Sequence, residues 1–330
     1  MAGRFRVQPR FLGPNPPFVE ARIGERPPLS AKIPRMKNIE LRGVIAAVFT
    51  PFTDSGEVDF ESLSSLVRFL LDKGIHGFFP CGSTGEGPLM RLEQRKRVLE
   101  RVIETVSGQV PVLAHVGTTN TEEAIELATH AEGQGVVAVA AITPFFIQPP
   151  LEGLAAHYQA IGDAVGVPTF AYNLPIFGGY NITPDDAQYL FERAGVKGIK
   201  DSTGNLIQLQ KVLDTAPEGT QIINGADTVM FSAMTMGTQA QISGMANVVP
   251  ELMVSLYESF AAGDLDNARA QQRRINDVVR TFTGPPVATR KAALKMRGIA
   301  PGLPRAPLIA LPEAEAQQLK TRLEALDLYW

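Results

Sequence analysis

The chain has 330 residues, of which 45% are hydrophobic and 20% charged, with a net charge of −3 and a mean hydropathy of +0.02. This length and composition exclude a disordered chain and a disulfide scaffold, and the lack of an overall basic field argues against a nucleic-acid partner. No run of about 18 apolar residues occurs, so we expect neither a transmembrane helix nor a membrane partner. The single cysteine, Cys81, cannot form an internal disulfide, which is typical of a cytoplasmic protein.

Residues 1–37 differ in composition from the rest of the chain. They contain seven prolines and many more basic than acidic residues. Proline is excluded from helix interiors and sheet ladders, so we expect an irregular, Pro-rich basic N-terminal arm. Three interpretations stay open: a targeting segment, an extension ahead of a true start at Met36, or an arm that packs on a neighbouring subunit.

From residue 43 onward, short apolar segments alternate with segments of helical periodicity. The predicted strands are 43–49, 77–80, 111–116, 136–143, 168–173, 196–200, 221–224 and 239–243. The helices predicted after them are 59–73, 91–106, 121–134, 151–165, 185–194, 205–215, 227–236 and 250–262. Continuous apolar strands are typical of a parallel sheet that is buried on both faces.

Eight strand–helix units in about 220 residues predict an α/β fold, a (β/α)8 TIM barrel over residues 38–263. A doubly wound sheet is the alternative, but residues 50–53 after the first strand lack its glycine fingerprint. Residues 264–330 show helical patterns only, at 265–281, 286–298 and 312–328. We therefore expect a C-terminal helical subdomain appended to one barrel.

Lys200 is the first candidate for chemistry, because it ends the sixth predicted strand, where catalytic groups of such barrels lie. A buried lysine is costly unless it is paired or neutral. A neutral amine can attack a ketone and form a Schiff base, whose iminium withdraws electrons from the adjacent carbon. The alternative is a structural lysine that pairs with Asp201 at the barrel rim.

Two further features follow other strands. The segment 82–87 has a spacing that matches neither a dinucleotide fingerprint nor a P-loop, and its Ser83 and Thr84 with exposed backbone N–H groups suit a small carboxylate. Its alternative is a glycine-rich turn into a helix. Tyr172 ends the fifth strand and could relay protons, or could only pack in the core.

Other chemistries have little support in the sequence. The four histidines, at 76, 115, 130 and 157, show no metal-ligand spacing, so we expect no metal, and no G-x-S-x-G motif indicates a serine hydrolase. We expect Cys81 to be a small buried strand residue and Glu86 to cap the helix that follows it or to pair locally.

Three segments in order, GSTGEG at 82–87, YNLP at 172–175 and GIKDS at 198–202, resemble the N-acetylneuraminate lyase / dihydrodipicolinate synthase family of pyruvate-dependent class I aldolases over about residues 40–320. The resemblance implies that Lys200 forms an imine with pyruvate or another 2-oxo acid and that Tyr172 relays protons. It implies no cofactor and a homo-oligomer, a dimer or a tetramer. The other residues that it implies for catalysis or substrate binding are Gly82, Ser83, Thr84, Gly225 and Ile242.

Two departures from the family pattern affect the expected substrate. Phe177 stands where lysine-pathway synthases carry an arginine for the second substrate's carboxylate, and Phe146 stands where the family often has a tyrosine donated across a dimer interface. With both phenylalanines in the pocket, we expect a lyase that cleaves or forms a 2-oxo-3-deoxy sugar acid to or from pyruvate and an aldehyde. The alternatives are a 4-hydroxy-tetrahydrodipicolinate synthase, which condenses pyruvate with aspartate semialdehyde, and a non-catalytic 2-oxo-acid-binding protein.

Overall fold

A computed structural model describes residues 41–327, and the arm expected at 1–37 lies outside them. Eight parallel strands form one sheet in the order β2-β1-β8-β7-β6-β5-β4-β3. A parallel bridge between Phe78 and Val112 joins β2 to the approach of β3, which closes the barrel. The strands are β1 (Gly43–Ala46), β2 (Gly77–Phe78), β3 (Leu113–His115), β4 (Ala138–Ile142), β5 (Thr169–Asn173), β6 (Gly198–Asp201), β7 (Gln221–Asn224) and β8 (Ala240–Ser243).

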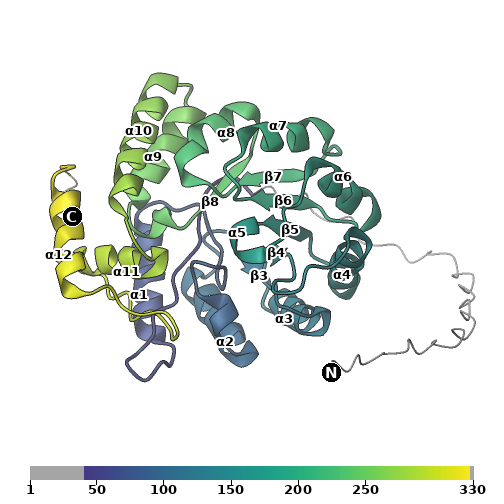
Figure 1. Ribbon diagram of the computed structural model, residues 1–330, viewed down its shortest axis with the longest axis horizontal. Helices are drawn as coiled ribbons and strands as arrows, with labels where there is room; N and C mark the ends of the chain where they lie inside the picture. The colour runs from purple at the N-terminus through teal and green to yellow at the C-terminus, as the bar shows by residue number, and fades with distance from the viewer. Residues whose placement is uncertain (1–40, 328–330) are drawn as a thin grey trace, which may run out of the picture. The chain divides into compact units, whose positions relative to one another are not determined.

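Helices surround the barrel and continue beyond it (Figure 1). The barrel helices are α1 (Phe60–Asp72), α2 (Leu92–Val106), α3 (Thr121–Gly133), α4 (Leu151–Ala164), α5 (Pro175–Gly178), α6 (Pro184–Arg193), α7 (Leu206–Thr215), α8 (Met230–Met236) and α9 (Pro250–Ala261). Three short 3-10 helices are η1 (Gly87–Leu89), η2 (Asp227–Val229) and η3 (Met245–Asn247). The C-terminal helices are α10 (Leu265–Thr281), α11 (Pro286–Met296) and α12 (Glu313–Glu324). The (β/α)8 barrel with C-terminal helices is thus confirmed.

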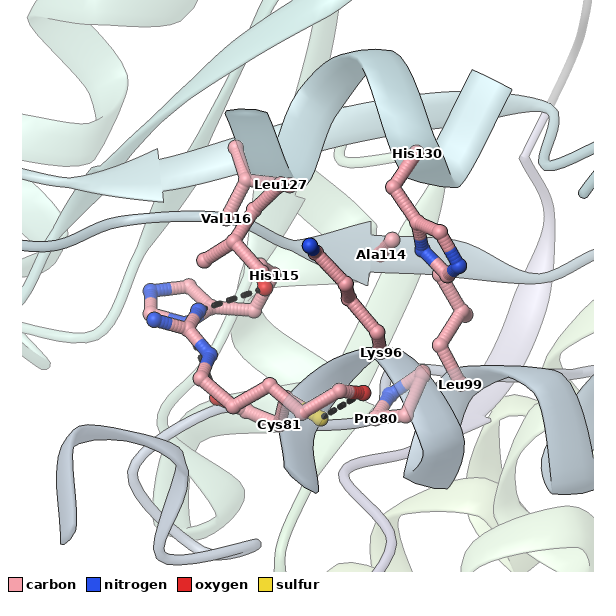
Figure 2. Close-up of a pocket in the computed structure, with 10 residues that line it drawn as sticks. Pro80, Cys81, Lys96, Leu99, Ala114, His115, Val116, Leu127 and His130 are labelled. Atoms are coloured by element: carbon pink, nitrogen blue, oxygen red, sulfur yellow. Dashed lines mark hydrogen bonds between the residues drawn. The ribbon is translucent and has the colours of Figure 1, made fainter. Parts of the chain in front are cut away.

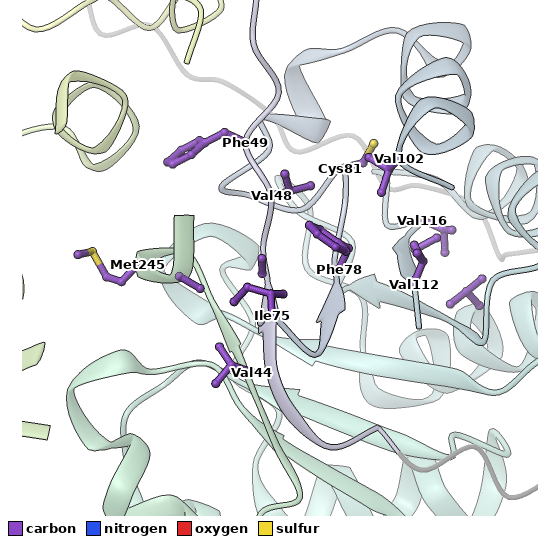
Figure 3. Close-up of a cluster of buried hydrophobic side chains, with 14 of the residues drawn as sticks. Val44, Val48, Phe49, Ile75, Phe78, Cys81, Val102, Val112, Val116 and Met245 are labelled. Atoms are coloured by element: carbon purple, nitrogen blue, oxygen red, sulfur yellow. The ribbon is translucent and has the colours of Figure 1, made fainter. Parts of the chain in front are cut away.

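Alternation along the strands separates two buried clusters of side chains. On β5, Tyr172 belongs to the cluster inside the barrel, whereas Ala171 belongs to the larger cluster between the strands and the helices. Figure 3 shows part of that outer cluster, with Val44 of β1 and Phe78 of β2 among its members. On β6, Ile199 packs in the outer cluster, and this places Lys200 on the inside.

Helix starts are fixed by short polar side chains. Asp59 caps α1 by accepting a hydrogen bond from Ser62 N at 3.0 Å, and Thr183 caps α6 together with Asp186. For α3 the cap is Asn120, which accepts from Glu123 N at 2.9 Å. The first helical residue is Thr121, where the predicted helix over 121–134 also begins.

A buried ion pair joins the C-terminal helices to the barrel. Lys291 of α11 lies 2.7 Å from Glu86, and both side chains are almost fully buried. Its ammonium also donates to the backbone oxygens of Thr50, at 2.8 Å, and Leu303, at 2.7 Å. The expectation that Glu86 caps the next helix or pairs locally is wrong, because Lys291 is remote in the chain and Glu86 forms no cap hydrogen bond.

No helix within residues 41–327 is both long enough and apolar enough to span a bilayer.

Candidate active site

Lys200 and Tyr172 are brought together by strand register. They are direct partners in the pairing of β5 with β6, and both side chains point into the barrel. Lys200 is only 3% exposed, and its Nζ lies 3.9 Å from the centroid of the Tyr172 ring and 4.4 Å from that of Phe79. The amine therefore lies against the faces of two aromatic rings inside the barrel.

Asp201 does not pair with Lys200. It faces away from the barrel interior, where its carboxylate accepts hydrogen bonds from Asn173 at 2.9 Å and Gln208 at 3.2 Å. The backbone N–H and hydroxyl of Thr203 also donate to it. The alternative of a Lys200–Asp201 ion pair at the rim is therefore wrong, because adjacent residues on a strand point to opposite faces.

Three rings form the floor beneath the amine. Phe79, His115 and Tyr172 meet edge to face, with centroids 5.7–5.9 Å apart. The N–H of Ile142 donates to His115 Nε2 at 3.3 Å, so we assign the ring proton to Nδ1, which lies 2.9 Å from the oxygen of Cys81. Burial and the nearby charge of Arg95 hold the pKa of His115 well below its usual value, so this ring is neutral at pH 7.

A buried arginine lies behind His115. Arg95 of α2 donates to the backbone oxygens of His115 at 2.8 Å and Gly117 at 3.0 Å. Figure 2 shows this side of the wall, where His115 and Cys81 border a small cavity of about 10 Å³, room for at most about one water. Burial raises the pKa of Cys81 to about 11, so its thiol is protonated and unreactive at neutral pH. Cys81 is buried as expected, but in a left-handed turn with φ 60° rather than in a strand.

The loop 82–87 brings hydroxyl groups to the mouth of the barrel. Ser83 Oγ lies 3.4 Å from the hydroxyl of Tyr172. The loop folds back on itself so closely that a Cβ at Gly87 would lie 1.7 Å from the oxygen of Cys81, which only glycine permits. Gly82 does not line the cavity described below. A Cβ there would lie 2.7 Å from the Phe79 ring, so the lack of a side chain at Gly82 makes room for that ring.

A cavity of about 650 Å³ opens above Lys200. Most of the residues singled out in the sequence line it together, although they come from five strand ends: Ser83, Thr84, Tyr172, Phe177, Lys200, Gly225 and Ile242. The neighbouring Phe145, Leu308 and Ile309 add apolar surface. This volume is typical of sites for small molecules.

Four polar residues of this cavity have no predicted role in the sequence analysis: His115, Ser202, Asp227 and Arg290. His115 and Asp227 do follow or end strands, and the rule that catalytic groups lie at strand ends could have found them. Arg290 is on α11, outside the barrel proper, and no motif marks it.

Phe146 does not line the cavity of its own chain. Its side chain is 95% exposed, and its φ of 79° turns the backbone so that Phe145, not Phe146, faces the cavity. The expectation that Phe146 lies in the pocket is wrong for a single chain. Residues 41–327 contain no group of three or more His, Cys, Asp or Glu side chains placed to hold a metal ion.

Comparison with known proteins shows to which family the whole chain is similar. The chain matches the Dihydrodipicolinate synthetase family over residues 40–326. It is 36% identical over 292 residues to the 4-hydroxy-tetrahydrodipicolinate synthase of Methanopyrus kandleri, an alignment that covers 88% of this chain and 97% of that protein.

Two solved structures share the whole architecture. YagE, a prophage protein of E. coli K12 crystallised with pyruvate, superposes with a TM-score of 0.83 at 29% identity, covering 87% of this chain and 99% of that one. A sialic acid aldolase of Ruminococcus gnavus, studied as a catalytic lysine mutant, gives a TM-score of 0.82 at 31% identity, covering 87% and 96%.

Proposed function

Because the chain belongs to the dihydrodipicolinate synthetase family, we propose that it is a lyase that forms a Schiff base between Lys200 and pyruvate. The observation that carries this proposal is the position of Lys200, buried at the floor of the cavity and beside a phenol. No carboxylate among residues 41–327 forms a salt bridge with its amine. A lysine without such a partner is available for nucleophilic attack.

In the proposed mechanism, Lys200 Nζ attacks C2 of pyruvate, the C2–O bond breaks and water leaves, which yields an iminium. The iminium accepts electrons, so C3 either loses a proton and attacks an aldehyde carbon or, in the reverse direction, the C3–C4 bond breaks and releases the aldehyde. Tyr172 moves the protons that these steps require, with Ser83 as its hydroxyl partner at 3.4 Å. Backbone N–H groups at Ser83 and Thr84 hold the carboxylate of pyruvate.

The second substrate has two candidates, each with its own support. The names of the relatives favour aspartate semialdehyde, since several are 4-hydroxy-tetrahydrodipicolinate synthases at 35–36% identity. This support is broader than that for a sugar acid. Support for a sugar acid comes from the similarity of this chain to a sialic acid aldolase and from the side chain of Phe177, which lines the cavity without offering a carboxylate contact.

A substrate panel separates these candidates. Pyruvate uptake is measured with aspartate semialdehyde and with hydroxylated aldehydes, and pyruvate release is measured from 2-oxo-3-deoxy sugar acids. Lys200→Arg, which keeps the charge but cannot form a stable imine, is the control and is expected to be inactive. Turnover of aspartate semialdehyde well above that of the sugar series assigns a synthase, and the reverse assigns a sugar-acid lyase. Binding of pyruvate without turnover of any member would instead support a non-catalytic 2-oxo-acid-binding protein.

We also propose that the chain forms a homo-oligomer. Four large apolar side chains, two on the loop after β4 and two on α5, are 60–95% exposed: Phe146, Ile147, Ile176 and Phe177. Exposed apolar clusters of this kind mark interaction surfaces, and a second copy of the chain would cover this one.

A further inference from the structure

Arg290 is a charged residue of the cavity to which the mechanism above gives no role. It lies on α11, and it lines the same cavity as Lys200 and Tyr172. Its Nε is buried and has no hydrogen-bond partner among residues 41–327. The side chain as a whole is partly exposed and lines the cavity, so its terminal N–H groups can donate to a ligand oxygen there.

Gly244, which follows β8, serves as a reference point for where the guanidinium of Arg290 lies relative to the strand ends. A Cβ at Gly244 would lie 2.9 Å from Thr84 Oγ1 and 3.3 Å from Arg290 Nη1, so these two atoms flank one point of the cavity wall. Asp227, which follows β7, also lines the cavity, and its carboxylate accepts a hydrogen bond from Gln241 at 3.0 Å.

Arg290 and Asp227 influence each other electrostatically, but no salt bridge joins them. Burial lowers the pKa of Arg290 and raises that of Asp227, and each charge opposes the shift of the other. Without a salt bridge to Asp227, the guanidinium of Arg290 keeps N–H donors for a ligand, whereas the Asp227 carboxylate already accepts hydrogen bonds from Gln241 and Ser243. Together Arg290 and Asp227 offer a donor and an acceptor side by side.

We infer that Arg290 is a specificity-determining residue that donates hydrogen bonds to oxygen atoms of the aldehyde half of the substrate. The inference rests on the proposed function and specifies the substrate class. Pyruvate has three carbons and fills only a small part of about 650 Å³, so most of the cavity is left for the other half. Phe145, Phe177 and Leu308, which also line the cavity, are apolar and offer such oxygens no donor.

The ligand oxygens could belong to a carboxylate or to hydroxyl groups, since a guanidinium binds both. An aldehyde that carries an ammonium or hydroxyl group as well would place that donor on Asp227. An aldehyde with no polar group beyond its carbonyl would use neither residue.

Steady-state kinetics of Arg290→Gln tests this assignment in the condensation direction. At saturating pyruvate, the KM and kcat for three aldehydes are compared: aspartate semialdehyde, which carries a carboxylate; glyceraldehyde, which carries hydroxyls; and acetaldehyde, which carries neither. Arg290→Lys, which keeps the charge but loses the fork of donors, is a second variant. Arg274→Gln, an exposed arginine of α10, is the matched control. Thermal unfolding establishes that each variant folds.

We expect Arg290→Gln to lower kcat/KM about 10- to 100-fold for the oxygen-bearing aldehyde that the wild type prefers, mainly through KM, because a hydrogen bond to a charged group is lost. Arg290→Lys should fall in between, and Arg274→Gln should match the wild type. Activity with acetaldehyde should stay within about twofold. A loss confined to aspartate semialdehyde identifies a carboxylate, and one confined to glyceraldehyde identifies hydroxyls.

Three results would overturn the inference: an equal loss for all three aldehydes, no loss for any, or a wild type that prefers acetaldehyde.

Trapping of the pyruvate imine with borohydride separates the two proposals. An imine that forms equally in the wild type and in Arg290→Gln leaves the proposed function intact whatever the aldehyde kinetics show. A weaker imine in Arg290→Gln would place the guanidinium on pyruvate itself and contradict the inference, whereas no imine in the wild type would remove the proposed function first.

Discussion

Lys200 and Tyr172 face each other across two neighbouring strands, with the Lys200 amine 3.9 Å from the centroid of the Tyr172 ring. The backbone register of β5 and β6 places the two residues directly opposite each other. The hydroxyl of Tyr172 is in turn 3.4 Å from Ser83 Oγ. A nucleophile, a proton carrier and a hydroxyl of the carboxylate loop therefore belong to one group.

Tyr172→Phe tests the proton role of this group. We expect kcat to fall about 10²- to 10⁴-fold, which is the usual contribution of a positioned proton carrier, with little change in thermal stability. Tyr158→Phe is the matched control, because the Tyr158 hydroxyl of α4 donates to the Ala141 oxygen of β4 at 2.9 Å, in the buried layer outside the barrel interior. That variant should lose about 1 kcal/mol of stability and keep its kcat. Equal kcat values for the two variants would contradict the role of Tyr172.

The Glu86–Lys291 ion pair should be important for stability. Lys291→Met leaves the carboxylate of Glu86 buried without its partner, and we expect the free energy of unfolding to fall by about 3–5 kcal/mol. The double variant Glu86→Gln/Lys291→Met should lose less than the sum of the two single variants, since no unpaired charge is left. Denaturant unfolding of the four proteins measures this coupling. Additive losses would show that the two side chains act independently.

The fold was predictable because its signals are local and repeat along the chain. Each strand is a short apolar run and each helix has an apolar stripe, and the eight repeats fix the barrel. The predicted and observed bounds differ mainly at strand ends. The strand predicted at 77–80, for example, is only Gly77–Phe78, because the chain then turns into the loop that leads to residues 82–87. The short helix α5 was missed, since four residues are too few to show a helical period.

The candidate site was only partly predictable, for a physical reason. Residues such as Lys200 and Tyr172 could be placed because strand ends converge in any barrel. Arg290 could not, because it reaches the cavity from α11, and that depends on how the C-terminal helices pack on the barrel. Glu86 was misassigned for the same reason, since its partner Lys291 is on that helix. The direction of the Phe146 side chain depends on the positive φ of this residue, which the periodicity of the sequence does not reveal.

His157 should make the stability depend on pH. Burial lowers its pKa from 6.5 to about 4, so between these values the unfolded chain binds a proton that the folded chain does not. The contribution of His157 to the free energy of unfolding is therefore complete above about pH 6.5 and falls as the pH is lowered. At pH 5 this residue alone lowers the free energy of unfolding by about 2 kcal/mol. His157→Asn should flatten the fall in the free energy of unfolding between pH 7 and pH 5. Parallel curves for the wild type and the variant would rule this out.

Phe146 should contribute to self-association. Phe146→Asp places a charge in the middle of the exposed apolar cluster, and we expect it to shift the protein to a smaller species in light scattering coupled to size-exclusion chromatography. Ile207→Asp is the control, because Ile207 is 75% exposed on α7 and lies outside the cluster. A wild type that is monomeric at high concentration, or an equal effect of both variants, would contradict the proposed interface.

The central claim is that Lys200 forms an imine with pyruvate, and reductive trapping tests it most directly. The protein is incubated with pyruvate and borohydride, digested, and analysed by mass spectrometry. We predict one reduced pyruvate on the peptide that contains Lys200, its absence in Lys200→Arg, and its retention in Lys197→Arg, a variant of an exposed lysine close by. No adduct at saturating pyruvate, or an adduct on a different lysine, would contradict the account.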